Sequence, residues 1–327
     1  MHNISDMESH LVDLKDIDDL PGPFCMSFEF NLEPLIQSIQ KIGLINSPVI
    51  VRNKKGRVDI VVGYRRIMAM KVLHMDKVPC RDLSHAGLTP LELLCLNLRD
   101  NLATRQFNDV EKAMVLARLT PLVTVQEILD TYMALLDLPS HEQTLFSFLS
   151  LEKDLEEEIK AYVAQGHISV SGAQSLLELK SDDRRHIFKL IRTLRLNMNQ
   201  QRKLIDLLDD ISYIENITIS EVLEQEPIEA ICLDRQMSNP QRAKALLAFL
   251  RSMRLPSVVR AERIFRKQVS KLNFPSGIRL TAPPFFEGSH YRLEVSFKKG
   301  KELKEKIERL SQIKGVEDLD DPWDQDT

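Results

Sequence analysis

The sequence predicts a multidomain α+β fold, with a small α/β domain at the N-terminus, an all-α domain in the middle and a small α+β module at the C-terminus. Three observations predict it. Short β-branched runs alternate with amphipathic stretches up to about residue 105, helical periodicity then continues to about residue 235, and two strand-like runs return after residue 275. The 327 residues are enough for two or three domains. We place the boundaries at 20–105, 106–235 and 240–315.

The N-terminal domain is predicted to begin with a helix and a hairpin. Apolar residues recur at helical spacing through 32–42, and Gly43 suits the position after a helix. Residues 48–52 and 58–62 are typical of strands, and a Gly-containing turn at 53–56 joins them.

The rest of this domain is predicted to contain a helix after the hairpin, a short strand at 77–81, and a helix that runs from Pro90 to about residue 100. Thr89 suits the N-cap of that helix, and Glu92 completes a capping box. Residues 1–19 are polar, and we expect them to be loose.

The middle domain is predicted to be helical throughout, and Asn108 with Glu111 forms its first capping box. Its expected helices are 109–118, 125–136, 140–151, 155–165, 171–179, 182–194 and 199–208. The C-terminal module is expected to contain helices 240–256, 256–272 and 301–310 and strands 278–281 and 291–297.

The net charge of −4 points to no polyanionic partner, but the charge is unevenly distributed. Residues 241–314 carry 18 Lys or Arg against 6 Asp or Glu, and residues 204–240 carry 1 against 9. The asymmetry fits separate modules and a polyanion or intramolecular contact, and it also fits ordinary solvated helix faces.

The four cysteines form no C-x-x-C pair, so neither a zinc site nor a disulfide framework is expected. The sequence has no apolar run of membrane-spanning length and no basic N-terminal segment followed by an apolar core. We therefore expect a cytoplasmic protein with reduced thiols and no membrane partner.

The strongest local signal for function is the stretch from Val58 to Ala69. A β-branched run stops at Gly63, and Arg65 and Arg66 then open an amphipathic stretch. A strand that leads through Gly into a helix brings backbone N–H groups and the positive end of the helix dipole to one place. Two arginines add forked donors that match phosphate oxygens. The stretch predicts an anion site, although a solvated helix start is the simpler interpretation of the arginines alone.

Three segments in order resemble boxes of the ParB family of partition proteins. Residues 43–52 are similar to the family's G-L-x-Q-P-x-x-V-R segment, and residues 63–69 to its G-E-R-R-x-R-A box. Residues 100–108, with Glu111 and Ala113, are similar to E-N-L-x-R-x-x-L-N followed by E-x-A. Together with a helical motif at 166–177, the resemblance covers roughly residues 20–215.

The resemblance implies a ParB- and sulfiredoxin-like N-terminal domain that binds CTP with Mg²⁺, and a helix-turn-helix middle domain that binds DNA. It also implies a dimeric, nucleoid-associated clamp that works in partition with a ParA-type ATPase. The nucleotide would contact Gly43, Asn46, Gly63, Arg65, Arg66, Asn101 and Arg105. Asp100 and Asn101 would lie near the metal, because oxygen ligands suit a hard cation.

Departures from the family pattern limit what the resemblance implies. Tyr64 replaces the acid of the second box, Asp100 is one methylene shorter than the family's Glu, and the Arg of the third box falls at Thr104, beside Arg105. Our hypothesis is that nucleotide binding persists in weakened form and that hydrolysis is doubtful, so the sequence leaves open whether the protein is an enzyme.

The expected recognition helix, residues 140–151, contains no Lys or Arg and includes Glu142. Because phosphate neutralisation provides most non-specific DNA affinity, this helix is poorly equipped for DNA. A rival basic surface is predicted from the next helices, with the cations Lys180, Arg184, Arg185, Lys189 and Arg192. DNA binding and a solvated basic face both remain open.

Two other functions stay open. A ParB-like domain can be a small-molecule kinase, for which Asp100 is the only base that the motifs suggest. Alternatively, the chain is a binding module that has lost catalysis and sequence readout and acts through its basic C-terminal module. Sulfiredoxin-type thiol chemistry is excluded, because Tyr64 occupies the position of the required Cys.

Overall fold

A computed structural model describes residues 8–18, 20–53, 56–288, 290–316 and 319. The chain divides into two compact units, residues 1–188 and 189–327. This division falls inside the predicted middle domain, and the three-domain boundaries stay a prediction.

The N-terminal sheet has the strand order β1-β4-β2-β3. β2 pairs antiparallel with β3 and parallel with β4, and β1 pairs antiparallel with β4. The strands are β1 (His10–Asp13), β2 (Val49–Arg52), β3 (Val58–Val62) and β4 (Lys77–Asp82). The predicted hairpin is confirmed, and the backbone of Asn53 donates to the Arg57 carbonyl at 2.9 Å to close it.

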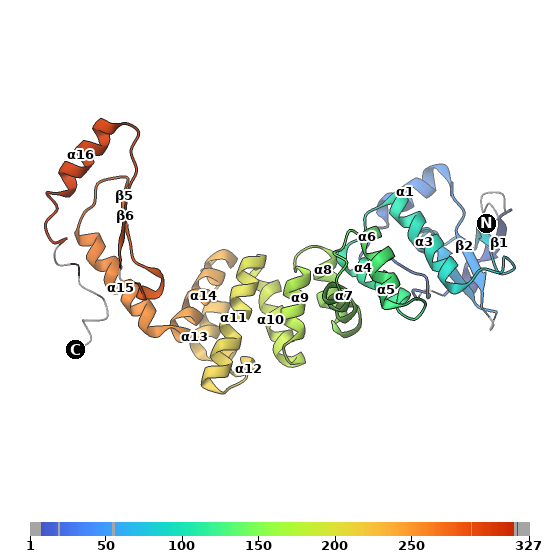
Figure 1. Cartoon of the computed structure of the whole chain (residues 1–327). Coiled ribbons are helices and arrows are strands. Elements are labelled where there is room, and N and C mark those ends of the chain that lie inside the picture. The colour runs from blue at the N-terminus through green and yellow to red at the C-terminus, as the bar shows by residue number, and fades with distance from the viewer. Residues whose placement is uncertain (1–7, 19, 54–55, 289, 317–318, 320–327) are drawn as a thin grey trace. The chain divides into compact units, whose positions relative to one another are not determined.

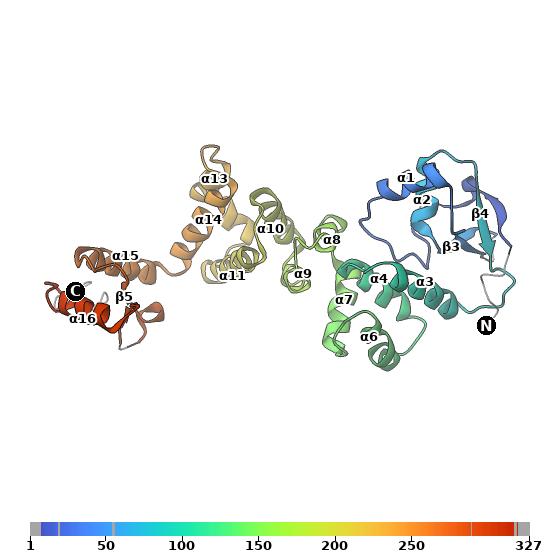
Figure 2. The same cartoon turned by 90° about the horizontal axis from the view of Figure 1, so that it is seen from above.

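The sheet packs with α1 (Glu33–Ile42), α2 (Tyr64–Val72) and α3 (Pro90–Thr104) in the blue and cyan part of the chain (Figures 1 and 2). α1 packs against α2, and α3 packs against β3. Fully buried aliphatic side chains from strands and helices form the core between them, among them Ile50, Ile67 and Val78. This core fixes the β3–α2 junction, where the anion site is predicted.

The prediction that residues 1–19 are loose was wrong for 10–17. β1 adds an edge strand, with Val12 opposite Val78, and Ile17 forms a parallel bridge to Val58. Both Val12 and Ile17 are buried. A four-residue strand is too short to show a sequence period, and its partner lies more than sixty positions away.

The helical part of the first unit follows the prediction closely. Both capping boxes are present, with Thr89 and Glu92 at α3 and Asn108 and Glu111 at α4. The expected helix 125–136 is interrupted by a π-helical turn, η3 (Ile128–Tyr132). The helices are α4 (Asp109–Leu119), α5 (Val125–Glu127), α6 (Met133–Leu135), α7 (Glu142–Asp154), α8 (Glu157–Ala164), α9 (Val170–Leu177) and α10 (Ser181–Leu194), the last of which crosses into the second unit.

The second unit contains a helical cluster followed by a small α+β module. α14 packs against α11 and α13, as the yellow and orange part of Figure 1 shows. The elements are α11 (Met198–Glu215), α12 (Ile219–Leu223), α13 (Glu226–Leu233), α14 (Asn239–Arg254), α15 (Pro256–Lys271), β5 (Ile278–Thr281), η4 (Pro284–Phe286), β6 (Arg292–Val295) and α16 (Gly300–Leu310). β5 and β6 pair antiparallel, as predicted.

Candidate functional site

A cavity of about 330 Å³ lies at the β3–α2 junction, between the loop after α1 and the C-terminal half of α3. Every residue predicted to contact nucleotide or metal lines this cavity: Gly43, Asn46, Gly63, Arg65, Arg66, Asp100, Asn101 and Arg105. Part of its wall is apolar, with Leu35, Ile39, Leu44 and Ile45 from α1 and the following loop. One side therefore suits an anion and the other an uncharged group.

Gly63 turns the chain from β3 into α2. Its φ is +94°, in the left-handed region that favours glycine. A Cβ atom at this position would lie 3.2 Å from both the Cα and the Cβ of Pro48. The glycine thus allows the first turn of α2, with its N–H groups and positive dipole end, to face the cavity closely.

Replacing Gly63 by Ala is expected to reduce the free energy of unfolding by about 1–3 kcal/mol, the usual range for a strained backbone conformation. Thermal unfolding monitored by circular dichroism measures this loss. Gly166→Ala is the matched control, because Gly166 also has a positive φ of +74° but a Cβ there meets nothing within 4 Å. A loss no larger at Gly63 than at Gly166 would show that the contact with Pro48 does not matter.

Arg66 connects two walls of the cavity. Its Nη1 donates to the backbone oxygen of Asn46 at 3.0 Å, and its Nη2 lies 3.5 Å from Oδ2 of Asp100. Asp100 remains 42% exposed in its side chain, so this ion pair is loose and open to water. The pair places a cation and a carboxylate together at the mouth of the cavity.

Arg65 and Arg105 share one buried carboxylate. Nη2 of Arg65 donates to Oε1 of Glu111 at 2.7 Å, and Nη1 of Arg105 donates to Oε2 at 2.5 Å. The Glu111 side chain is only 1% exposed. Residues from the second and third boxes are thereby joined through the first turn of α4.

More of the nitrogen atoms of Arg105 than of Arg65 are hydrogen-bonded to protein atoms. Its Nε donates to Oδ1 of Asn101 at 2.7 Å and its Nη2 to the backbone oxygen of Met26 at 2.6 Å. Its pKa lies below the usual arginine value because burial disfavours the cation, although Glu111 opposes this shift. All three nitrogens of Arg105 therefore donate to protein atoms, which suits a structural group better than the predicted nucleotide contact.

The carboxamide of Asn101 is engaged on both sides. Its oxygen accepts from Arg105, and its Nδ2 donates to the backbone and side-chain oxygens of Asn97 at 2.9 and 2.6 Å. An oxygen that already faces a guanidinium is a poor ligand for a divalent cation. Of the two predicted metal ligands, the exposed carboxylate of Asp100 is therefore better placed than Asn101.

Tyr64 directs its ring toward Phe30, with the ring centroids 6.0 Å apart in an edge-on arrangement. The guanidinium of Arg65 lies over the same Phe30 ring, 4.8 Å from its centroid. Tyr64 thus occupies the acidic position of the second box as a packing group. Among the described residues that line the cavity, Asp100 is the only acid.

Residues 3–91 match the family model of the ParB N-terminal domain. A probable chromosome-partitioning protein ParB of Vibrio cholerae is 25% identical over 72% of this chain and 77% of its own length. Stage 0 sporulation protein J of Bacillus subtilis is 27% identical over 72% of this chain and 80% of its own length. The N-terminal part of the chain thus matches the ParB family, and most of the chain is similar, at low identity, to ParB proteins.

Coverage of other ParB relatives is partial. A probable chromosome-partitioning protein ParB of Coxiella burnetii is 27% identical over 53% of this chain, and the match spans 57% of the relative. A solved, C-terminally truncated ParB of Caulobacter crescentus complexed with CTP-gamma-S is 18% identical, covering 52% of this chain and 92% of that chain at a TM-score of 0.26. The same protein complexed to the centromeric parS site is 17% identical, with coverages of 61% and 99% and a TM-score of 0.32.

The site contains one ParB-box residue whose role the sequence did not reveal. Glu111 was expected only as a capping-box residue and as part of the third box. Its pairing with Arg65 spans 46 positions, and its pairing with Arg105 spans 6. The one available signal was that this capping-box position also belongs to a ParB motif.

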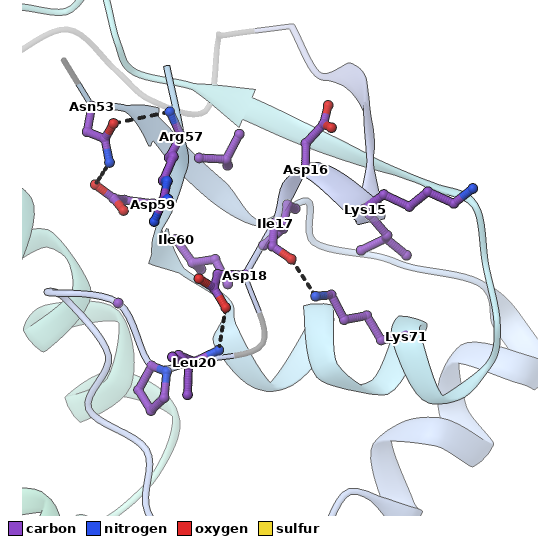
Figure 3. Close-up of a pocket in the computed structure, with 14 residues that line it drawn as sticks. Lys15, Asp16, Ile17, Asp18, Leu20, Asn53, Arg57, Asp59, Ile60 and Lys71 are labelled. Atoms are coloured by element: carbon purple, nitrogen blue, oxygen red, sulfur yellow. Dashed lines mark hydrogen bonds between the residues drawn. The ribbon is translucent and has the colours of Figure 1, made fainter. Parts of the chain in front are cut away.

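A second, larger cavity of about 640 Å³ lies beside the outer edge of β3 (Figure 3). Its rim mixes both signs of charge, with Lys15, Asp16, Asp18, Arg57 and Asp59 (Figure 3). Lys71 already donates to the backbone oxygen of Ile17 at 2.5 Å. By size alone, this cavity would be the better candidate for a ligand site. However, the charged groups around it are of both signs, and it is lined by none of the residues predicted to contact nucleotide or metal.

In the helical region of the chain, α7 carries one cation, Lys153, in its last turn. Glu142, Gln143 and Phe146 are exposed on α7, which packs through Leu145, Phe148 and Leu151. Near the centre of α7, Gln174 donates to the backbone oxygen of Ser147 at 2.7 Å.

The predicted basic surface is only partly present. Lys180, Arg185, Lys189 and Arg192 are exposed, although Arg185 pairs with Asp182. Arg184 departs from the prediction, because it is buried and donates twice to Oε1 of Glu156, at 3.0 and 2.8 Å. It has to be left out of any DNA-facing set.

Within the described ranges, no three His, Cys, Asp or Glu side chains gather as a metal-binding group. None of the helices in these ranges combines the length and the apolar character needed to span a bilayer.

Proposed function

We propose that the cavity at the β3–α2 junction binds a nucleoside triphosphate, with CTP expected from the ParB resemblance. One observation carries the proposal: Arg65, Arg66 and the Gly63-capped start of α2 converge on one cavity of about 330 Å³. Its volume lies in the range of small-molecule sites. Two guanidinium groups and the backbone N–H groups of α2 would meet the triphosphate there, and the apolar wall from α1 would meet the nucleoside.

The residues also fit a bound Mg²⁺. Asp100 offers an exposed carboxylate 3.5 Å from Arg66, so the cation and the phosphates would share one mouth of the cavity. Magnesium usually takes one or two carboxylates plus phosphate oxygens, and bound there it would neutralise phosphate charge. Arg66 would then exchange its loose contact with Asp100 for a phosphate.

We propose binding without rapid turnover. Hydrolysis needs a group that orients or deprotonates water, and Tyr64 packs against Phe30 where the family box has an acid. The kinase alternative meets the same difficulty, because Asp100 would have to serve as both metal ligand and base. The lining of the cavity therefore favours a binding site over either enzyme.

Calorimetric titration of the full chain with CTP, ATP and GTP in the presence of Mg²⁺ tests the proposal. We expect binding in the micromolar range, strongest for CTP, with phosphate release close to the rate without protein. Absence of heat with all three nucleotides would refute the proposal. Rapid phosphate release would refute the assignment of Tyr64 as a non-catalytic replacement.

We further propose that the protein acts with DNA in chromosome or plasmid partition. The names of two relatives, both chromosome-partitioning proteins, support the first of these. Sequence-specific readout through α7 is disfavoured by its exposed Glu142 and by its lack of cations at the N-terminal end. The exposed cations of α10, Lys189 and Arg192 among them, support weak contact with phosphates.

Gel-shift titration across a salt series measures this contact. We expect binding at low salt that is largely lost by about 0.2 M salt, because phosphate contacts release counterions. Lys189→Glu with Arg192→Glu should weaken it at least tenfold. The control, Lys41→Glu with Arg57→Glu, makes the same charge change at exposed positions elsewhere and should have little effect. Absence of a shift at low salt would exclude DNA binding.

The resemblance also implies a homodimer and a ParA-type partner. The C-terminal module supports the first, because Leu293 on β6 and Phe297 beyond it are 46% and 50% exposed on a sheet of two strands. Light scattering of the full chain tests the homodimer, and a monomeric mass would exclude it. The ParA partner stays a prediction that co-purification with the neighbouring gene products can test.

A further inference from the structure

We propose that Glu111 is a positioning residue that sets the direction of the phosphate-binding arginine Arg65. The inference rests on the proposed triphosphate site and assigns a role to a residue that does not line the cavity. Glu111 would act through Arg65 alone, without touching the nucleotide.

The carboxylate of Glu111 is saturated by four donors. Oε1 accepts from the backbone N–H of Phe28 at 3.2 Å and from Arg65 at 2.7 Å. Oε2 accepts from the backbone N–H of Asn108 at 3.2 Å and from Arg105 at 2.5 Å. A carboxylate has about four lone-pair sites, so Glu111 has no free site for a metal or a proton in transfer.

These contacts hold Arg65 in one orientation. Nη2 is fixed by Glu111, Nε donates to Oγ of Ser27 at 3.1 Å, and the guanidinium plane lies over Phe30 at 4.8 Å. Within the described part of the chain, Nη1 of Arg65 has no hydrogen-bond acceptor, and the residue lines the cavity. The two protons of Nη1 are therefore available to a phosphate, and because the guanidinium is already directed, the entropy cost of binding is lower.

Glu111 also allows two arginines to lie together. Arg65 and Arg105 are close enough that the charge of Arg65 acts on the ionisation of Arg105. One carboxylate between them leaves a net charge of +1. Without that carboxylate the two guanidinium groups would repel each other, and Arg65, the more exposed of the two at 31% against 17%, would move first.

Calorimetric titration with CTP and with inorganic tripolyphosphate, which lacks base and sugar, tests the role in the full chain. Glu111→Gln keeps the shape but removes the charge and turns an NH₂ group toward one arginine. We expect at least tenfold weaker binding of both probes, equivalent to 1.4 kcal/mol. The double variant Glu111→Gln with Arg65→Ala should bind no more weakly than Arg65→Ala alone, because both changes remove the same contact.

Asn108→Ala is the matched control, since it removes the other half of the α4 capping box without touching an arginine. It should lower the melting temperature and leave affinity unchanged. If Glu111→Gln is unfolded at the assay temperature, Glu111→Asp, which keeps the charge but shortens the arm, takes its place with the same expectation of weaker binding.

The outcomes separate the two proposals. If the wild type binds both probes and the folded Glu111 variant binds them equally well, or if its effect adds fully to that of Arg65→Ala, the positioning role is refuted alone. If the wild type binds neither probe, both the proposed nucleotide site and the positioning role of Glu111 are refuted.

Discussion

Replacing Glu111 by Ala is expected to lower the free energy of unfolding of the first unit by about 3 kcal/mol, the low end of the range for removing one partner of a buried ion pair. The change strips the acceptor from Arg65, Arg105 and two backbone N–H groups at once. We take the low end because Arg65 and Arg105 keep 31% and 17% of their side chains exposed, so water screens part of the loss. Urea unfolding monitored by circular dichroism measures it.

Glu92→Ala is the matched control for this change. Glu92 occupies the same capping-box position in α3, where it accepts from the backbone and hydroxyl of Thr89 at 2.8 and 2.9 Å. Its surroundings are exposed, and among the residues that the structure describes it has no arginine partner. Equal losses at the two positions would show that Glu111 contributes only as a helix cap.

Arg66→Ala is expected to weaken nucleotide binding about 100-fold, or about 2.8 kcal/mol. A hydrogen bond to a charged group contributes about 1.5–3 kcal/mol, and the loss of Arg66 removes both such a donor and a positive charge from the cavity that would hold the phosphates. Calorimetry with CTP and Mg²⁺ measures the change. Arg66→Lys should recover part of the affinity, because it restores the charge but not the fork.

Arg57→Ala serves as the control for net charge, because Arg57 lines the other cavity at the edge of β3. Its affinity for CTP should stay within twofold of the wild type. If Arg57→Ala weakened binding as strongly as Arg66→Ala, the nucleotide would have to be sought in the larger cavity.

Local signals predicted most of the fold. The hairpin, the Gly63 turn and the capping boxes at α3 and α4 each depend on residues within a few positions of one another, and all are present. β1 was missed because it is stabilised by pairing with β4, which lies far away in the sequence. The π-helical turn in η3 was missed because a single extra residue in a helix leaves the apolar spacing nearly unchanged.

The sequence named residues that line one cavity, but it did not show which of their side-chain donors are already bonded to protein atoms. Motif position placed Arg65, Arg66 and Arg105 together, and the cavity contains all three. Motifs carry no information on which donors are already used, so Arg105 was expected to contact the nucleotide. For the same reason Arg184 was expected at the surface, although its partner Glu156 lies 28 positions earlier.

Glu111 both caps α4 and binds Arg65 and Arg105, and this double role limits which substitutions the position can accept during evolution. Other helices of the chain close their capping boxes with glutamine, with Gln200 at α11 and Gln241 at α14. As a cap, glutamine would therefore be an acceptable neutral substitute at position 111 as well. Because the Glu111 side chain also binds two arginines, replacement by glutamine would not be neutral at position 111. Position 111 should therefore vary less among descendants of this chain than positions 92, 200 and 241.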